Sequence, residues 1–504
     1  MKEGLTPIRF GTDGWRALLA EEFTFANLER VSQAYADYLL GQNETKEDSP
    51  LQQLIAVGQI SKQEAESGLF RNVIQKAQPP LVIVGFDRRF LSENFAGRAA
   101  EVLAGNGLRV ALFEKDVPTP VVSWAVKLNR AAGGVVITAS HNPPAFNGFK
   151  IKASWGGSAP PEITSAVEAL VDKNGPRRGQ STSDERELLQ SSIDSYRAQI
   201  AAYIDLESIR RTRLKVVIDP MHGTGGRWVE SFLAGRDLRA ETIRADRDTL
   251  FGGVNPEPID RNLAPLKKRV MEAGARLGLA TDGDADRVGA VNEKGETMTM
   301  HEVVPLILLH LARARKMKGA VVRTFSQSVL TKRIAEAHNL PLYDTPIGFK
   351  YVADLMLRDD ILIGAEESGG IGVKGHIPER DGILNSLLLL EAVVAAGRPP
   401  SEMVKAIHRE FGEFYFDRRD LHCEVERGKQ LVSTLAQSPP AKISSHPVRD
   451  VETLDGTKLL FDDESWLLFR QSGTEPVLRI YSEATSRAKT EALLDEGERF
   501  ARKL

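Results

Sequence analysis

The stretch Gly134-Val135-Val136-Ile137-Thr138-Ala139-Ser140-His141-Asn142-Pro143-Pro144 joins a short apolar run to a polar loop. The run predicts a buried β-strand, and the two prolines stiffen the loop that follows it. Ser140 would then lie at a strand end. Serine is also common in plain turns, but His141 and Lys150 supply a titratable group and a cation nearby in sequence. Phosphoryl transfer uses groups of both kinds, so Ser140 is a candidate phosphoryl carrier.

Two further apolar runs have the same arrangement as this strand. Leu277-Gly278-Leu279-Ala280 and Ile361-Leu362-Ile363 each precede a loop rich in polar or charged residues. Helical patterns over 92–105 and 328–339 alternate with such strands, which predicts the α/β class. Sheets of this class bind ligands outside the carboxyl ends of their strands. The three loops could therefore converge on one site.

The length of the chain indicates several domains. Its 504 residues exceed what one hydrophobic core normally supports. Changes of pattern place the boundaries near 195, 305 and 415, which gives domains 1–195, 196–305, 306–415 and 416–504, with a predicted hairpin over 288–297 before the second boundary. The polar segments 43–50 and 173–184 are predicted linkers or surface excursions.

The composition excludes several classes of protein. Hydrophobic residues make up 42% and charged residues 27%, as in ordinary globular proteins, and the net charge is −3 without a basic, aromatic-rich run. We therefore expect neither nucleic acid nor membrane as a partner. Cys423 is the single cysteine, which excludes an internal disulfide and fits a reducing compartment. The apolar runs are too short to span a bilayer and no signal core is visible, so we expect a cytoplasmic protein.

The loop Asp282-Gly283-Asp284-Ala285-Asp286-Arg287 carries three alternating carboxylates, which repel one another unless a cation binds them. A calcium loop of the calmodulin type would need glycine at its sixth position, where Arg287 stands. An aspartyl-phosphate phosphatase would leave Ser140 without a role, and a solvated acidic turn is commoner for isolated Asp pairs than for this cluster. A Mg²⁺ site completed by a phosphate oxygen fits best.

Two later loops offer groups for a sugar and a phosphate. Gly364-Ala365-Glu366-Glu367-Ser368-Gly369-Gly370, followed by His376 and Arg380-Asp381-Gly382, could hydrogen-bond sugar hydroxyls. Arg470-Gln471-Ser472-Gly473-Thr474-Glu475-Pro476, followed by Arg479 on a predicted strand, could hold a phosphate. Taken alone, the first could be a surface loop and the second an ordinary hairpin turn.

Together with Phe10-Gly11-Thr12-Asp13-Gly14-Trp15-Arg16, these motifs resemble the α-D-phosphohexomutase superfamily, which includes phosphoglucomutases and phosphomannomutases. Five motifs occur in the order of the family, over almost the whole chain. The resemblance implies three related mixed-sheet α/β domains and a smaller C-terminal α+β domain around a central cleft. It also implies hexose phosphates as substrates and a monomer or small homo-oligomer.

The resemblance assigns a role to each motif. Ser140 is the expected phosphoserine, and Arg16, His141 and Lys150 are expected to transfer protons and stabilise charge. Ser140, Asp282, Asp284 and Asp286 are the expected ligands of Mg²⁺. The expected substrate-binding residues are Arg287, Lys350, Glu366, Ser368, His376, Arg470, Ser472, Gly473, Thr474 and Arg479. Glu366 is preferred to Glu367 because its spacing to Ser368 matches the family, although Ala365 leaves a one-residue ambiguity.

The segment Thr345-Pro346-Ile347-Gly348-Phe349-Lys350 is similar to the glucomutase loop, which favours glucose 1-phosphate and glucose 6-phosphate as the interconverted pair, with glucose 1,6-bisphosphate as intermediate and activator. Mannose phosphates are further candidates. A glucose 1,6-bisphosphate synthase that uses an external phosphoryl donor would need the same residues and remains an alternative. A non-catalytic sugar-phosphate sensor is a second one, but it would need neither Ser140 nor its metal. The segment 43–70 resembles an insertion without an assigned function.

Overall fold

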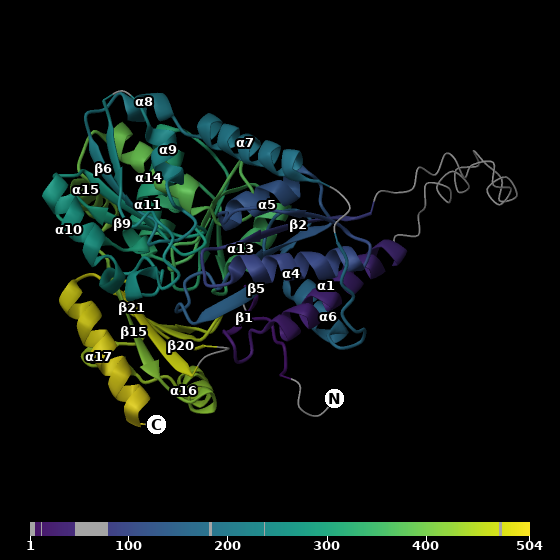
Figure 1. Ribbon diagram of the computed structural model, residues 1–504. Helices are drawn as coiled ribbons and strands as arrows, with labels where there is room; N and C mark the ends of the chain where they lie inside the picture. The colour runs from purple at the N-terminus through teal and green to yellow at the C-terminus, as the bar shows by residue number, and fades with distance from the viewer. Residues whose placement is uncertain are drawn as a thin grey trace, which may run out of the picture. The chain divides into compact units, whose positions relative to one another are not determined.

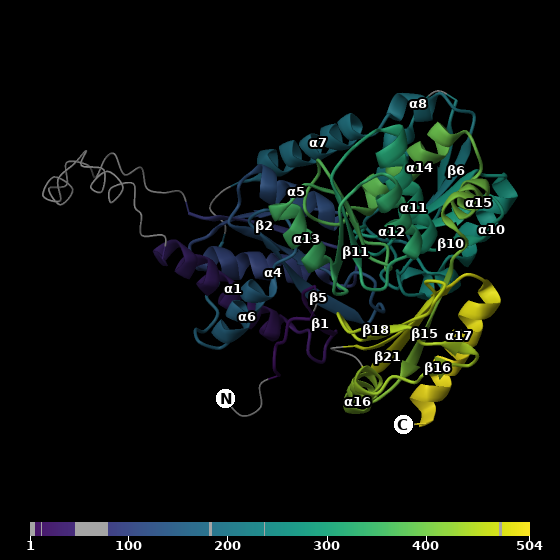
Figure 2. The ribbon, with the colours of Figure 1, turned by 180° about the vertical axis from the view of Figure 1, so that it is seen from behind.

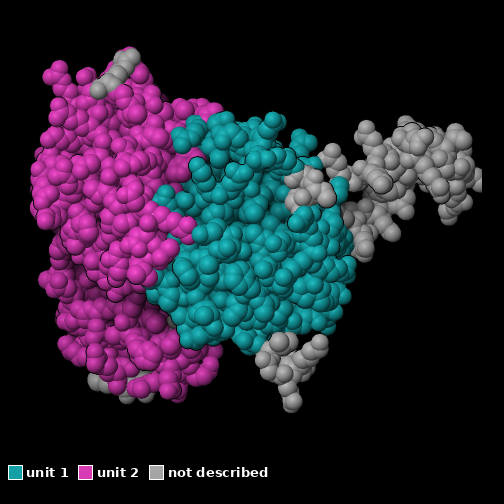
Figure 3. All heavy atoms as spheres, in the orientation of Figure 1, with its two compact units in different colours: residues 1–197 teal, residues 198–504 magenta. Residues whose placement is uncertain are grey.

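The computed structural model describes residues 6–11, 13–45, 79–180, 184–235, 237–472 and 476–503. Two compact units divide the chain, residues 1–197 and residues 198–504 (Figure 3). Gly473, Thr474 and most of the segment 43–70 lie outside the described residues.

The sheet of the first unit has the strand order β1-β5-β4-β2-β3. Its strands are β1 (Trp15–Leu18), β2 (Leu81–Phe86), β3 (Arg109–Leu112), β4 (Gly133–Ile137) and β5 (Phe146–Ala153). Strand β2 pairs in parallel with β3 and β4, whereas β5 runs antiparallel to β4 and β1. Since β4 contains the predicted strand 134–137, the loop of Ser140 leaves the carboxyl end of the central strand.

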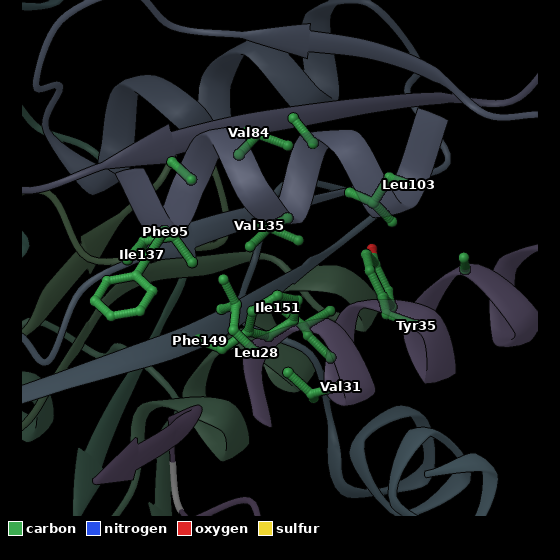
Figure 4. Packing of buried hydrophobic residues seen from close by; sticks show 14 of the residues in the cluster. Leu28, Val31, Tyr35, Val84, Phe95, Leu103, Val135, Ile137, Phe149 and Ile151 are labelled. Atoms are coloured by element: carbon green, nitrogen blue, oxygen red, sulfur yellow. The ribbon is translucent and has the colours of Figure 1, made fainter. Parts of the chain in front are cut away.

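Helices cover both faces of this sheet (Figure 1). On one face, α1 (Phe25–Thr45) and α4 (Ser92–Gly105) pack on the sheet, and α6 (Pro161–Leu170) packs on α1. Figure 4 shows Leu28 and Val31 of α1 near Phe149 and Ile151 in this core. On the other face lies α5 (Thr119–Leu128), which approaches so closely that a Cβ on Gly134 would lie 2.7 Å from Val126 Cγ2. The unit is an α/β/α sandwich.

Helix α4 coincides with the helix predicted over 92–105. The segment 43–50 is predicted to be a linker or a surface excursion; a linker is wrong for its first three residues, because α1 continues to Thr45. Polar residues are compatible with a helix end, where the last carbonyl groups are open to water. The second predicted linker is confirmed over 173–180, which contain no helix or strand. Helix α7 (Arg186–Tyr203) follows it.

The second unit begins with a mixed sheet of strand order β10-β9-β8-β6-β7. Its strands are β6 (Lys215–Asp219), β7 (Arg239–Thr242), β8 (Leu277–Thr281), β9 (Val288–Asn292) and β10 (Thr297–Met298). Its helices are α8 (Leu206–Arg210), α9 (Trp228–Leu233) and α10 (Ala264–Ala273). The predicted hairpin over 288–297 is the antiparallel pair β9 and β10. The three aspartates follow β8, as the sequence predicted.

A third sheet has the strand order β12-β11-β13-β14. Figure 2 labels its strand β11. Its strands are β11 (Ala320–Thr324), β12 (Leu342–Thr345), β13 (Ile361–Ala365) and β14 (Ile371–Val373). Its helices are α11 (Met300–Leu309), α12 (Val329–Ala337), α13 (Phe349–Arg358), α14 (Gly382–Ala396) and α15 (Pro400–Phe411). Among the described residues, no single helix is long and apolar enough to cross a membrane; α14 and α15 reach that length only as a pair bent by 76°.

The C-terminal module is an antiparallel sheet of order β15-β21-β20-β19-β18. Its strands are β15 (Tyr415–His422), β18 (Asp450–Glu452), β19 (Thr457–Leu460), β20 (Trp466–Gln471) and β21 (Val477–Ala484), with the small hairpin β16 (Lys442–Ile443) and β17 (His446–Pro447) beside it. Leu435 of α16 (Val425–Gln437) and Leu493 of α17 (Arg487–Lys503) join one core with Phe469 of β20. Both helices therefore cover the same face of the sheet.

Candidate active site

Ser140 occupies an uncommon backbone conformation directly after β4. It is buried, and its φ of 51° lies in the left-handed region, which a residue with a side chain rarely adopts. Its N–H donates to Thr138 Oγ1 over 2.8 Å, and the Thr138 hydroxyl donates to Asp87 Oδ2 over 2.6 Å. Its Oγ lies 3.4 Å from His141 Nδ1. Such strain at a polar side chain is typical of a functional site.

The side chain of Arg89 fixes the backbone of the loop that carries Ser140. Its guanidinium is fully buried and donates to the carbonyl oxygens of Ser140 and Asn142, each over 2.7 Å, and to that of Pro143 over 2.8 Å. Asp87 accepts from Arg89 Nε over 3.1 Å and balances its charge. The sequence patterns did not single out this pair. A signal was present, because Asp87 and Arg89 follow the apolar run of β2 as Ser140 follows that of β4.

The predicted cations of this unit make different contacts. Arg16 donates from Nη1 to Asn142 Oδ1 over 2.7 Å, so it reaches the loop of Ser140. Lys150 lies on β5 opposite Val136, and its buried Nζ pairs with Asp13 Oδ2 at 3.0 Å. Asp13 also accepts a hydrogen bond from the Ser158 hydroxyl over 2.9 Å. Asp13 was part of the N-terminal motif, but nothing in its spacing assigned it to Lys150.

The segment 282–287, here called the metal loop, brings its three carboxylates together in the interior. Asp282, Asp284 and Asp286 are all fully buried, and one oxygen of each lies within 4.8 Å of the others. Burial, followed by the charges of Asp286 and Asp284, raises the pKa of Asp282 well above its usual value. A hard divalent cation would relieve this repulsion, and an all-oxygen donor set fits Mg²⁺.

A glycine-rich loop after β6 supports the metal loop. Thr224 N–H donates to the carbonyl oxygen of Gly283 over 3.0 Å. A Cβ on Gly223 would lie 2.7 Å from Gly283 O and 2.8 Å from Asp282 O, so only glycine fits there without displacement. Met221 and His222 just before it have φ values of 51° and 62°. The backbone of the metal loop is therefore held by the strained, closely packed loop after β6, which the sequence motifs did not indicate.

The sugar loop, residues 364–370, follows β13 and contains two glutamates in different surroundings. Burial raises the pKa of Glu366 to about 7, although the charges of Arg380 and Arg287 oppose the shift. Burial acts in the same direction on Glu367, but the charge and hydrogen bond of Arg418, together with the charges of Arg479 and His301, outweigh it and lower the pKa of Glu367. Arg418 Nη1 pairs with Glu367 Oε1 at 2.7 Å. The predicted Arg287 lies beside this loop, since it forms a β-bridge with Gly370.

Three other residues predicted to bind the substrate near the sugar loop make contacts of different kinds. His376 Nε2 lies 2.9 Å from Asp381 Oδ2, and Asp381 caps α14 by accepting from Ile383 N and Leu384 N. His376 thus contacts the residue that caps α14. Ser368 is half-buried, next to Glu367. Lys350, in the first turn of α13, has its Nζ 5.0 Å from the centre of the Tyr351 ring.

The predicted phosphate-binding turn joins β20 to β21. Arg470 and Arg479 are directly opposite each other in the antiparallel register. Like charges in such a position destabilise a sheet unless an anion or a carboxylate lies between them. Asp455, which the motifs did not indicate, accepts from Arg470 Nε over 3.0 Å. Ser472 N–H donates to Val477 O over 2.9 Å and closes the described part of the turn.

Family models match four consecutive parts of the chain. They are the phosphoglucomutase/phosphomannomutase alpha/beta/alpha domains I, II and III, at residues 63–178, 194–295 and 300–411, and the C-terminal domain of the same family at residues 422–499. Three α/β/α domains and a C-terminal domain in this order confirm the predicted fold class. They define a phosphohexomutase, which is an intramolecular phosphotransferase.

Full-length comparisons agree with the domain matches. A phosphoglucomutase/phosphomannomutase of Thermococcus kodakarensis is 32% identical over 83% of this chain and 89% of its own. A phosphoglucosamine mutase of Frankia casuarinae is 28% identical over 96% of both chains. The crystal structure of a "putative phosphomannomutase" from Thermus thermophilus is 36% identical, with a TM-score of 0.80 over 99% of each chain. The chain belongs to the phosphoglucomutase/phosphomannomutase family of the α-D-phosphohexomutase superfamily.

Proposed function

We propose that this phosphohexomutase interconverts glucose 1-phosphate and glucose 6-phosphate through a phosphoserine at Ser140. The observation that carries the proposal is the geometry of Ser140, which is held in a left-handed conformation. Buried Arg89 fixes three carbonyl groups of its loop. An ordinary turn serine would not require a fully buried guanidinium beneath it, because burying an arginine is costly unless its hydrogen bonds are satisfied.

In the proposed reaction, a hydroxyl oxygen of the bound sugar monophosphate attacks the phosphorus on Ser140. The bond from phosphorus to Ser140 Oγ breaks, a new bond to the sugar oxygen forms, and glucose 1,6-bisphosphate results. The hydroxyl proton leaves to a base of the site, and Ser140 recovers a proton. The distance of 3.4 Å between His141 Nδ1 and Ser140 Oγ supports the assignment of His141 as a group that exchanges a proton with that oxygen. The other phosphate then returns to Ser140 by the same exchange of bonds.

Cations would stabilise the charge on the transferred group. We assign Arg16 and Lys150 to this role beside Ser140. When bound at Asp282, Asp284 and Asp286, Mg²⁺ supplies positive charge to phosphate oxygens, including that of the modified Ser140. The buried like charges of the three aspartates support this assignment.

Sugar recognition is assigned to the second unit. Glu366 and Ser368 would bind sugar hydroxyls, and the pairing of Glu367 with Arg418 supports the choice of Glu366. Arg470 and Arg479, opposite each other on β20 and β21, would bind the non-reacting phosphate. The other proposed substrate-binding residues are Arg287, Lys350, His376, Ser472, Gly473 and Thr474. The proposal keeps domain boundaries near 195, 305 and 415 and a cytoplasmic location.

Glucosamine phosphates are a second candidate substrate class. The Frankia casuarinae relative, similar over 96% of this chain, is named a phosphoglucosamine mutase. An amino group at C2 replaces the hydroxyl there, whereas the family resemblance implies that Glu366 and Ser368 contact hydroxyls remote from C2. The proposed site would therefore admit either sugar, and a comparison of rates decides between them.

The test compares kcat/KM for the 1-phosphates of glucose, mannose and glucosamine, with Mg²⁺ and a trace of the matching 1,6-bisphosphate. We expect the highest value for glucose 1-phosphate. A tenfold preference for glucosamine 1-phosphate would establish the second candidate instead. Ser140→Ala should abolish turnover. Ser444→Ala is the matched control, because exposed Ser444 has the same φ of 51° in the turn between β16 and β17. Near-normal turnover of Ser140→Ala would refute the proposal.

A further inference from the structure

The metal loop and the sugar loop are joined through their backbones. Arg287 forms a β-bridge with Gly370, and Val288 N–H donates to Gly369 O over 3.0 Å. Gly369 has a φ of 96°, and a Cβ there would lie 2.5 Å from Val288 O. Because the contact is this close, a displacement of one loop must be transmitted to the other.

Arg380 connects the same two loops through its side chain. Only 3% of the residue is exposed. Its Nη2 lies 3.0 Å from Asp286 Oδ2 in the metal loop, and its Nη1 lies 4.0 Å from Glu366 Oε2 in the sugar loop. Its Nε lies 3.2 Å from Glu379 Oε1, which anchors the near end of the guanidinium. One buried cation thus lies between a carboxylate of the metal loop and a carboxylate of the sugar loop.

The surroundings of Arg380 leave it little freedom. A Cβ on Gly370 would lie 2.5 Å from Arg380 Cδ, so the sugar loop fits against the side chain only with glycine at that position. Gly382, two residues after Arg380, donates from N to Ala285 O of the metal loop over 3.0 Å. The segment that carries Arg380 is therefore fixed to the metal loop, and the guanidinium lies between Asp286 and Glu366.

We propose that Arg380 is a positioning residue that couples occupancy of the metal site to sugar binding at Glu366. This inference rests on the proposed function, in which the three aspartates bind Mg²⁺ and Glu366 binds sugar hydroxyls. A divalent cation at Asp286 weakens the attraction of this carboxylate for the guanidinium. Arg380 then interacts more strongly with Glu366 and holds its carboxylate in one orientation for the sugar. Each ligand consequently raises the affinity for the other, by the same factor.

Calorimetric titration of the full chain tests the coupling without turnover if every protein carries Ser140→Ala. The dissociation constant of Mg²⁺ is measured with and without saturating glucose 6-phosphate, and that of glucose 6-phosphate with and without Mg²⁺. In the parent we expect both ratios to be equal, at about fivefold or more. Arg380→Gln should bring the ratios to about 1, a value that marks lost coupling, while each ligand still binds alone.

Three further variants make the test specific. Glu366→Gln removes the carboxylate at the other end of the connection and should also bring the ratio to about 1. Combining it with Arg380→Gln should not lower the coupling any further. Arg380→Lys keeps the positive charge and should retain part of the coupling between the two ligands. Lys374→Gln is the matched control, because Lys374 pairs with the exposed Asp360 and contacts neither loop carboxylate; it should keep the parental ratio. If Arg380→Gln does not fold, the ratio in Glu366→Gln decides.

The possible failures can be told apart. An Mg²⁺ affinity that Asp284→Asn leaves unchanged would remove the metal site from the proposed function, and the role of Arg380 with it. If Asp284→Asn weakens Mg²⁺ binding but Arg380→Gln keeps the parental ratio, only the coupling role is wrong. A ratio of about 1 in the parent, which means no linkage between the two sites, likewise overturns it.

Discussion

Glu367 of the sugar loop and Arg418 of β15 form an ion pair of 2.7 Å between the third sheet and the C-terminal module. The Glu367 side chain is 8% exposed and that of Arg418 27%. Both charges are therefore largely removed from water. Arg418 also pairs with Asp420 at 3.1 Å, but the Asp420 side chain is 41% exposed, so Glu367 is the more buried partner. The pair ties the loop proposed to bind the sugar to the module proposed to bind its phosphate.

Arg418→Met should destabilise the protein by about 2 kcal/mol, because it leaves the Glu367 carboxylate buried without its guanidinium. The double variant Arg418→Met with Glu367→Gln should recover most of this loss, since the buried charge of Glu367 is then removed together with its partner. Urea denaturation of the wild type, both single variants and the double variant measures the coupling energy. If the two single effects simply add, the ion pair does not contribute as the structure indicates.

Gly223→Ala should weaken Mg²⁺ binding about tenfold, an effect of about 1.4 kcal/mol. The added methyl group would lie 2.7 Å from Gly283 O and 2.8 Å from Asp282 O, so the metal loop must move. Gly97→Ala in α4 is the control, because nothing lies within 4 Å of a Cβ there and alanine favours helices. Calorimetry with Mg²⁺ provides the measurement. Equal affinities in Gly223→Ala and wild type would show that the metal loop does not depend on this packing.

The contrast between the predicted and the observed site has a physical origin. The predicted strands before Ser140, Asp282 and Glu366 are confirmed, because short apolar runs followed by polar loops are local patterns. Arg89 and Asp455 were not predicted, because their contacts are non-local. Arg89 reaches carbonyl groups more than 50 residues away, and Asp455 accepts from Ile347 N across 108 positions. No periodicity in a single sequence encodes which distant backbone groups will meet.

His376 illustrates the opposite case. Its position in a family-like motif predicted contact with the substrate, whereas the structure shows its Nε2 against Asp381, the residue that caps α14. A motif constrains the residue type but not the reason for it, and a helix cap beside a binding loop satisfies the same pattern. The assignment of His376 to the substrate therefore stays a prediction.

Glu391 should make the stability of the protein depend on pH in the acid range. Burial raises its pKa, but hydrogen bonds from His310, Arg315 and the Asp205 N–H, together with the charge of Arg315, outweigh that effect and lower the pKa to about 2 from 4.5. A depressed folded-state pKa adds stability that is complete above about pH 4.5 and is lost as the pH falls towards 2. Glu391→Gln should therefore destabilise by about 2 kcal/mol at pH 7 and flatten the pH profile of unfolding between these values.

The control for this prediction is Glu410→Gln. Glu410 pairs with Arg313 at 2.5 Å, but both side chains are about half exposed, so its removal should change stability by less than about 0.5 kcal/mol. Urea denaturation at several pH values between 3 and 7 distinguishes the two variants. A Glu391→Gln profile as steep as that of the wild type would mean that other carboxylates dominate the acid response.

Lys458 on β19 should make the stability of the protein depend on pH in the alkaline range as well. Its buried ammonium donates to Phe325 O over 3.0 Å and lies 4.5 Å from the centre of the Trp466 ring. Burial lowers its pKa from 10.5 to about 8, so the unfolded chain binds more protons between these values and stability rises with pH there. Lys458→Met, which keeps the aliphatic stem and removes the charge, should abolish this rise and stabilise the protein at pH 7 by about 1 kcal/mol.

Lys429→Met on α16 is the control for this prediction. That side chain is 59% exposed, so removing its charge should change neither the stability at pH 7 nor the rise of stability with pH. A wild-type stability that stays constant from pH 8 to 10 would show that the Lys458 ammonium is compensated by its carbonyl and aromatic contacts as fully as by water.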